Sequence, residues 1–309
     1  EGGSWRASHG RKLIFAGDLI DRGSDVLQVL RTVRDLEQSG VAHVVMGNHE
    51  YNFICYNEKF DSDRAPEGGF GSDGWLRSHS EEHRLQHLES ITAFSQAPQE
   101  CQSHLKWLQK LPILADFGGL RVVHAAWLPP RVERLREMGW NRTIDGAQFT
   151  GVDLDFIHRS WGSWRHPQQS EEFILIENLI KGPEAPLPDG WFYRDKLGTQ
   201  RHRARLRWWL SSDRPLPRSW RELAILPAGL EPPFEETSLE SGLFQEIGYP
   251  DAAPPVVVGH YWQTGIEDAF WSSKVACVDW STARGGPLAA YRWSGESELI
   301  AQHFISVQG

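Results

Sequence analysis

Hydrophobic positions near the start of the chain follow two different periods. An apolar run at 12–16 predicts a short strand, and the apolar positions within 26–36 recur at the three-and-four spacing of an amphipathic helix. We expect Ser24 to cap this helix and Gly40 to end it. A second short apolar run, 41–46, predicts another strand. Strand, helix and strand in this order predict a βαβ unit with parallel strands and a right-handed crossover.

The central part of the chain is predicted to be more helical. Residues 79–95 and 100–111 are expected to form two helices, and the pair Gly118-Gly119 between apolar runs predicts a β-hairpin. The stretch 128–250 is the least regular and is predicted to contain helices at 132–138 and 171–181.

The last third of the chain is rich in strand signals. Predicted strands lie at 255–258, 274–280, 288–294 and 298–306. The β elements at the two ends need each other for burial, so we expect one α/β domain over 1–309. Loops are expected at 1–11 and 61–74, with insertions at about 58–110 and 128–250, the second of them mostly helical.

Composition and charge narrow the classes of protein. The chain has 309 residues with 40% hydrophobic and 24% charged residues, which is ordinary for a soluble protein. A net charge of -9 argues against general nucleic-acid binding or an anionic membrane surface. No apolar run approaches the roughly 20 residues that cross a bilayer. Three scattered cysteines favour a reducing, cytoplasmic compartment over a disulfide framework or a thiolate zinc site.

Four polar residues stand at or just beyond the ends of predicted strands. They are Asp18, Asn48, His124 and His260, and three of them directly follow a glycine. Glycine lets the backbone turn sharply and approach a ligand closely. A carboxylate, an amide oxygen and two imidazoles suit manganese, iron or zinc better than calcium or a thiolate site. Four positions with one local pattern therefore predict a divalent transition-metal site, with manganese favoured.

Three further side chains lie close to these candidate ligands in the sequence: Asp21 and Arg22 on the same turn as Asp18, and His49 directly after Asn48. If Asp18 and Asn48 hold metal, Asp21 and His49 lie just outside it and can form a hydrogen bond. Such a bond would raise the pKa of the imidazole and keep it protonated as a general acid. Arg22 offers a planar fork to a tetrahedral oxyanion. The alternative is a surface ion pair between Asp21 and Arg22, which would contribute little.

The quoted segments resemble a known family. Residues 17–23, with the sequence GDLIDRG, and 47–50, with GNHE, are similar to the second and third signatures of calcineurin-like metallophosphoesterases. The form is the one shared by phosphoprotein phosphatases and bacterial diadenosine-tetraphosphatase-like enzymes. The segments around His124 and His260 resemble the fourth and fifth signatures, and 277–293 resembles the closing strand pair of the bacterial members. The resemblance implies a two-sheet β-sandwich flanked by helices.

The resemblance also implies a role for each residue. Asp18 would bridge two metals, and Asn48, His124 and His260 would complete the second metal site. His49 with Asp21 would serve the leaving group, and Arg22 would bind phosphate. Two ions about 3.5 to 4 Å apart would then activate a water that attacks phosphorus in line.

One signature of the family is missing from this sequence. The Asp-x-His motif that should precede Asp18 by some 25 residues, and that supplies the other ligands of the first metal, is absent. We therefore expect either an N-terminally incomplete domain or a natural variant that retains one metal site. Only one of the two metals has its full set of ligands in this chain.

Two sets of residues could add substrate contacts. Arg201, Arg203 and Arg205 alternate and would share one face of a strand, where they could supply the second phosphate-binding arginine usual in the family or form a solvated face. Trp127, Tyr261 and Trp262 lie beside candidate ligands and could stack on a nucleobase, although packing is favoured.

Three functions remain open at this point. The first is hydrolysis of a nucleotide-like small molecule such as a dinucleoside polyphosphate. The second is Ser/Thr phosphoprotein phosphatase activity with the same catalytic residues. The third is a catalytically impaired metal- or phosphate-binding protein that lacks the first metal motif.

Overall fold

The computed structural model describes most of the chain. The described residues are 10–60, 74–162, 170–188, 190–194, 198–214, 219–227, 229–230 and 246–308. The loops predicted at 1–11 and 61–74 lie almost entirely outside these ranges. No helix within them is long and apolar enough to span a membrane.

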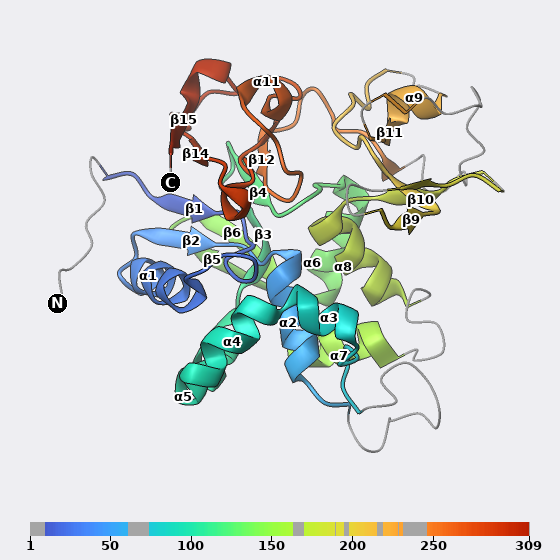
Figure 1. The fold of residues 1–309 in the computed structure, drawn as a ribbon. Coiled ribbons are helices and arrows are strands. Elements are labelled where there is room, and N and C mark those ends of the chain that lie inside the picture. The colour runs from blue at the N-terminus through green and yellow to red at the C-terminus, as the bar shows by residue number, and fades with distance from the viewer. Residues whose placement is uncertain are drawn as a thin grey trace.

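The first βαβ unit is confirmed. Strand β1 (Leu13–Phe15) pairs in parallel with β2 (Ala42–Val44), and helix α1 (Val26–Gln38) connects them (Figure 1). The apolar stripe of α1 is buried, as its spacing predicts. The predicted cap is wrong, because Asp25 rather than Ser24 occupies the N-cap and no side chain there bonds to the helix.

A six-stranded mixed sheet forms the centre of the molecule. Its order is β13, β12, β4, β3, β6, β5. The bounds of these strands are β3 (Pro112–Asp116), β4 (Arg121–Val123), β5 (Trp140–Ile144), β6 (Ala147–Gly151), β12 (Val256–Val258) and β13 (Val275–Cys277). β13, β12 and β4 are parallel, whereas β4, β3, β6 and β5 pair antiparallel. The hairpin predicted around Gly118-Gly119 is therefore confirmed as β3 and β4.

The hairpin β5–β6 adds two strands to the insertion at 128–250, which was predicted to be mostly helical. Its two strands lie within 128–250, yet they extend the central sheet. They are joined by Asp145 and Gly146, which both have positive φ, at 51° and 84°. Asp-Gly is a strong signal for a tight two-residue hairpin turn, and the alternation of Asn141, Thr143 and their neighbours fits it. The irregular composition of the surrounding segment obscured this signal.

Both faces of the central sheet are buried. Val256 and Val258 contribute to one hydrophobic core and Val257 to another, as the period of two requires. The second core also contains residues of the antiparallel pair β14 (Leu288–Tyr291) and β15 (Phe304–Val307). A sheet buried on both sides explains why its strands are continuously apolar in sequence.

Helices cover the other face. Figure 1 shows α2 to α5 and α7 gathered on the side opposite β14 and β15. The bounds of these helices, and of α6 and α8, are α2 (Asn48–Asn57), α3 (Glu81–Gln86), α4 (Leu88–Gln96), α5 (Pro98–Leu108), α6 (Pro129–Met138), α7 (Leu154–Gly162) and α8 (Glu171–Lys181). The single helix predicted at 79–95 is in fact two, α3 and α4, which meet at His87.

The remaining strands form small sheets beside this centre. β10 (Arg203–Leu206) pairs with β7 (Glu184–Pro186) and β11 (Ala224–Ile225), and β8 (Tyr193–Arg194) pairs with β9 (Gln200–Arg201). Two further helices are short: α9 (Trp220–Leu223) precedes β11, and α11 (Ile266–Ala269) follows β12.

Candidate metal centre

The turn after β1 has an unusual backbone. Asp18, Asp21 and Arg22 have φ of 57°, 66° and 55°, and His260 has 67°. Left-handed backbone is disfavoured for residues with a Cβ atom, and such strain is concentrated at functional sites. Gly17, at φ +89°, is packed so closely that an added Cβ would lie 2.5 Å from the Gly47 nitrogen. The two glycine turns therefore meet in direct contact.

The four candidate ligands converge at this point. His124 Nε2 lies 3.2 Å from Asp18 Oδ1 and 3.1 Å from Asn48 Oδ1, and His260 Nδ1 lies 2.8 Å from Asn48 Oδ1. Ligand atoms of Asp18, His124 and His260 all lie within 4.8 Å of one another, and they form the one such group found in the described part of the chain. Segments that are distant in the sequence thus bring four potential metal-ligand atoms to one point.

The chemistry of these atoms fits a cation. His124 Nδ1 donates a hydrogen bond to the Ala16 carbonyl at 2.6 Å, which leaves the lone pair of Nε2 directed toward the oxygens of Asp18 and Asn48. His260 Nε2 is buried and has no hydrogen-bond partner among the described residues. Lone pairs facing one another repel unless a proton or a metal ion lies between them. The residues present therefore fit a divalent metal, with each imidazole offering a nitrogen.

The pKa values of the ligand side chains are shifted by burial and by the charges of their neighbours. Burial lowers the pKa of His124, but the Asp18 carboxylate outweighs burial and raises it to about 9. Burial also works to raise the pKa of Asp18, yet the charges of His124 and His49 hold it below its usual value. Burial lowers the pKa of His260, and the positive charge of Arg205 lowers it further. The Asp18 carboxylate therefore stabilises positive charge at this point of the site.

Glu50 connects the turn that carries Asp18 to the turn that carries Asn48. Its carboxylate is completely buried and accepts hydrogen bonds from the backbone nitrogens of Gly47 at 2.8 Å, Asp18 at 2.9 Å and Leu19 at 2.6 Å. This supporting role was not predicted from the sequence. The signal available was its place three residues after the N-cap of α2, where a Glu accepts from the backbone of the cap.

Asp21 is held by three side chains. His49 Nδ1 lies 2.7 Å and His87 Nδ1 2.8 Å from Asp21 Oδ2, while Ser90 Oγ donates to Oδ1 at 2.5 Å. The predicted pairing of Asp21 with His49 is present in this geometry. Burial raises the pKa of Asp21, but the hydrogen bonds from both histidines bring it below the usual value. Burial lowers the pKa of His49, but Asp18 and Asp21 together raise it above the usual value.

His87 and Ser90 were missed because their segment was predicted as one continuous helix. His87 stands instead between α3 and α4, and its ring is 1% exposed. A buried histidine at a helix junction has no periodic signature, so only the three-dimensional contact with Asp21 identifies it.

The predicted phosphate-binding arginines occupy different surroundings. Arg203 bonds to the backbone of Glu184, whereas Arg205 Nε lies 3.6 Å from the Glu184 carboxylate, and its charge acts on His260. Arg201 lies on the separate strand β9. Of the three, Arg205 is the one whose charge acts on a candidate metal ligand.

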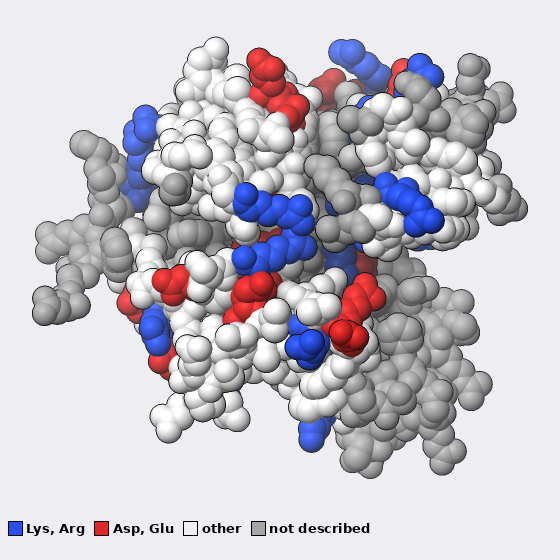
Figure 2. Space-filling view, viewed as in Figure 1, with Lys and Arg blue, Asp and Glu red and all other residues white. Residues whose placement is uncertain are grey.

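Arg22 has a neighbour that the sequence did not reveal. Its guanidinium carbon lies 4.3 Å from the centroid of the Trp262 ring, and that of Arg284 lies 4.0 Å from it. Burial lowers the pKa of Arg22, and Arg284 lowers it further by like-charge repulsion. Figure 2 shows basic side chains gathered in the middle of one face of the molecule, next to acidic ones. Trp262 is therefore in contact with guanidinium groups.

The other two aromatic candidates pack in the interior. Trp127 is 1% exposed, and Tyr261 is 7% exposed and accepts a hydrogen bond from Trp208 at 3.2 Å. Neither ring is open to a nucleobase, which agrees with the favoured prediction of packing.

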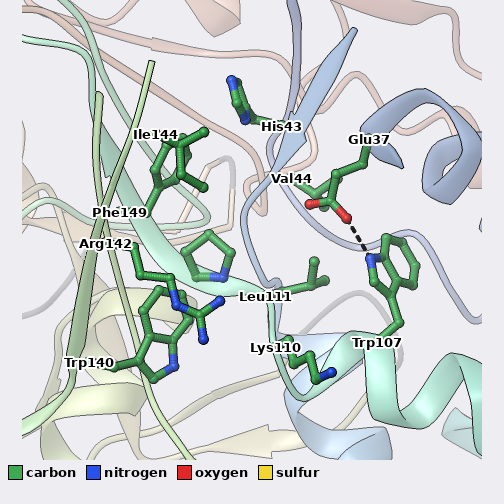
Figure 3. A pocket seen from close by; sticks show the side chains of 11 residues that line it. Glu37, His43, Val44, Trp107, Lys110, Leu111, Trp140, Arg142, Ile144 and Phe149 are labelled. Atoms are coloured by element: carbon green, nitrogen blue, oxygen red, sulfur yellow. Dashed lines mark hydrogen bonds between the residues drawn. The ribbon is translucent and has the colours of Figure 1, made fainter. Parts of the chain in front are cut away.

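A cavity lies away from these residues. It has a volume of about 230 Å³ and contains none of the candidate ligands (Figure 3). Trp107 donates a hydrogen bond to Glu37 at 2.6 Å on one side of it, and Trp140 and Arg142 line the other. This cavity is separate from the metal centre.

Fold and site together define a class of protein. A mixed α/β fold that gathers a carboxylate, a carboxamide and two imidazoles at neighbouring strand ends belongs to a metal-binding α/β protein. The comparison with family models is more specific, because residues 7–159 match the model described as calcineurin-like phosphoesterase. The chain therefore contains a metallophosphoesterase domain and is a phosphoric ester hydrolase by family.

Curated proteins similar to this chain carry one shared description. A symmetrical bis(5'-nucleosyl)-tetraphosphatase of Methylobacillus flagellatus is 26% identical, with 92% of this chain and 82% of that protein covered. The protein of that description from Chromobacterium violaceum is 23% identical, with coverage of 91% and 80%. The one from Aromatoleum aromaticum is 27% identical over 60% of this chain and 61% of its own length.

Proposed function

We propose that this protein hydrolyses dinucleoside polyphosphates with the help of a divalent metal ion, for which manganese is the favoured choice and iron or zinc the alternatives. The observation that carries the proposal is the convergence of lone pairs from Asp18, Asn48, His124 and His260 at one point. The relatives described as bis(5'-nucleosyl)-tetraphosphatases support the substrate class.

Each residue has a distinct task in this proposal. The four converging side chains would hold the metal, and the chemistry that it supplies when bound is polarisation of a phosphoryl oxygen and activation of a water molecule. Arg22 would bind the phosphate with its planar fork, and Arg205, whose positive charge acts on His260, would be a second phosphate-binding arginine.

The leaving group is assigned to His49. Its Nδ1–H donates to Asp21, so Nε2 is the atom that can carry a proton to the departing phosphate oxygen. Asp21 is itself fixed by His87 and Ser90, so the imidazole has one orientation. The alternative function, a Ser/Thr phosphoprotein phosphatase, would use the same residues and is decided by the substrate. A cytoplasmic site of action is part of the proposal.

The test is a substrate panel with the full chain, stripped by a chelator and reloaded with Mn²⁺. Diadenosine tetraphosphate should be cleaved to adenine nucleotides, which are separated and counted by anion-exchange chromatography. The variant His49→Asn should lower the rate about 10²-fold or more, whereas the control His303→Asn, on the C-terminal hairpin, should leave it unchanged. Release of orthophosphate from phosphopeptides without cleavage of diadenosine tetraphosphate would overturn the proposed substrate.

Metal content tests the third possibility. A chain that holds at most one ion, as measured by elemental analysis of the reloaded protein, is incompatible with a two-metal mechanism. Hydrolysis that is undetectable under these conditions would favour a binding protein without catalytic activity.

A further inference from the structure

Arg22 and Arg284 lie over the ring of Trp262, two residues after His260, and lack the partners that arginines usually have. Both Arg22 and Arg284 are exposed, and both stack on Trp262. Among the described residues, neither guanidinium forms a hydrogen bond or an ion pair with another side chain. Their guanidinium carbons are at most about 8 Å apart, which is the sum of the two distances to the shared ring. Like charges held this close repel each other.

The backbone around Arg284 is built to hold it there. Arg284 ends a short 3₁₀ helix, η3 (Thr282–Arg284), which follows Ser281 in a left-handed conformation at φ 60°. Asp279 Oδ1 accepts a hydrogen bond from the Ser281 nitrogen at 3.0 Å, which fixes the start of this segment. Gly286 packs so tightly that an added Cβ would lie 2.0 Å from the Trp280 carbonyl oxygen. The position of Arg284 therefore follows from a strained, closely packed turn.

Acidic groups nearby do not neutralise the pair. Asp18, Asp21 and Asp279 attract Arg22 electrostatically, but none of them lies within ion-pair distance of its guanidinium. Asp18 and Asp21 are already engaged by histidines, and Asp279 by the Ser281 nitrogen. The free faces and edges of both guanidiniums thus remain available to an external anion.

We propose that Arg22, Trp262 and Arg284 form a clamp for a chain of adjacent phosphates. Arg22 would bind the phosphate that is attacked, and Arg284 would bind the next phosphate of the same substrate. Trp262 holds both guanidinium groups against its ring, so their N–H donors remain free for the phosphates of a substrate. This clamp rests on the proposed function and assigns specificity for polyphosphates over phosphate monoesters to a particular side chain.

The test compares Arg284→Gln with the wild type on two substrates. Diadenosine tetraphosphate can reach both arginines, whereas p-nitrophenyl phosphate has a single phosphate and can reach only one. The variant should raise the KM for diadenosine tetraphosphate about tenfold or more, because a charged hydrogen bond to phosphate is lost, and should change kcat/KM for p-nitrophenyl phosphate less than about twofold. Arg292→Gln, an exposed arginine on the same C-terminal segment, is the matched control.

A direct binding measurement separates this clamp from the proposed function. In calorimetry without added metal, the wild type should bind tripolyphosphate at least about tenfold more tightly than orthophosphate, and Arg284→Gln should abolish that difference. If diadenosine tetraphosphate is cleaved but the variant affects both substrates equally or not at all, the clamp is wrong and the proposed function stands. If diadenosine tetraphosphate is not cleaved, the proposed function fails, and the calorimetric comparison alone decides the clamp.

Discussion

Glu50 offers the sharpest test of how the metal centre is supported. The change Glu50→Gln keeps the shape of the side chain but replaces one of its two oxygens by an amide nitrogen. In the native protein these two oxygens accept three backbone hydrogen bonds, at 2.8, 2.9 and 2.6 Å. In either orientation of the amide, at least one backbone N–H loses its acceptor and faces another donor. The turns that carry Asp18 and Asn48 would then lose a common anchor.

The magnitude follows from the type of bond. A hydrogen bond to a charged group contributes about 1.5 to 3 kcal/mol, and a buried donor without a partner adds its own penalty. We therefore expect Glu50→Gln to lower the free energy of unfolding by about 2 to 3 kcal/mol, a large share of the 5 to 15 kcal/mol that is typical. Since outer partners orient metal ligands, the affinity for Mn²⁺ should also fall about 10- to 100-fold.

Urea denaturation and calorimetric Mn²⁺ titration measure these two effects. Glu81→Gln, on the exposed first turn of α3, is the control and should change the free energy of unfolding by less than about 0.5 kcal/mol. Burial raises the pKa of Glu50, and Asp18 raises it further. A variant as stable as the wild type would mean that Glu50 is already protonated in the native protein, which would refute a carboxylate anchor.

Two further predictions concern packing and pH. Gly17→Ala should destabilise the protein by more than about 2 kcal/mol and abolish Mn²⁺ binding, because the new Cβ would lie 2.5 Å from the Gly47 nitrogen and 2.9 Å from His124 Nδ1. The control Gly118→Ala has a similar φ but open space around the new Cβ, so it should lower the free energy of unfolding, measured by urea denaturation, by only about 1 kcal/mol. Equal losses in the two variants would contradict the close contact at Gly17. Burial works to raise the pKa of Glu296, but hydrogen bonds from Tyr291 and from backbone nitrogens lower it to about 2. Because this lies below the usual 4.5, the stabilisation is present above that pH and is lost as the pH falls toward 2. Glu296→Gln should therefore flatten the fall of Tm between about pH 5 and 3, and parallel curves for both proteins would show that Glu296 makes no such contribution.

Local sequence patterns predicted the elements that carry the site. The strands before Asp18 and Asn48 and the helix between them are set by hydrophobic periods that act over a few residues. The glycine before each polar residue also has a local cause, since the chain must turn there. These features could therefore be predicted without any knowledge of the folded neighbours.

The partners of these residues could not be predicted in this way. His87 reaches Asp21 across 66 positions, and Arg284 reaches Arg22 through a shared tryptophan. Both contacts depend on how a helix junction and a 3₁₀ turn pack against a distant loop, which no periodicity records. The β5–β6 hairpin is a different case, because its Asp-Gly turn was a usable local signal within an irregular segment.

The left-handed backbone at Arg22 has a consequence for engineering this protein. At φ 55°, any side chain with a Cβ atom destabilises the native turn, and glycine would remove that strain. Arg22→Gly should thus be more stable than Arg22→Ala by about 1 kcal/mol, although both variants lack the guanidinium. A search for thermostable variants would favour glycine at this position and would in the same step select against phosphate binding. Stability and activity are here opposed at a single φ angle.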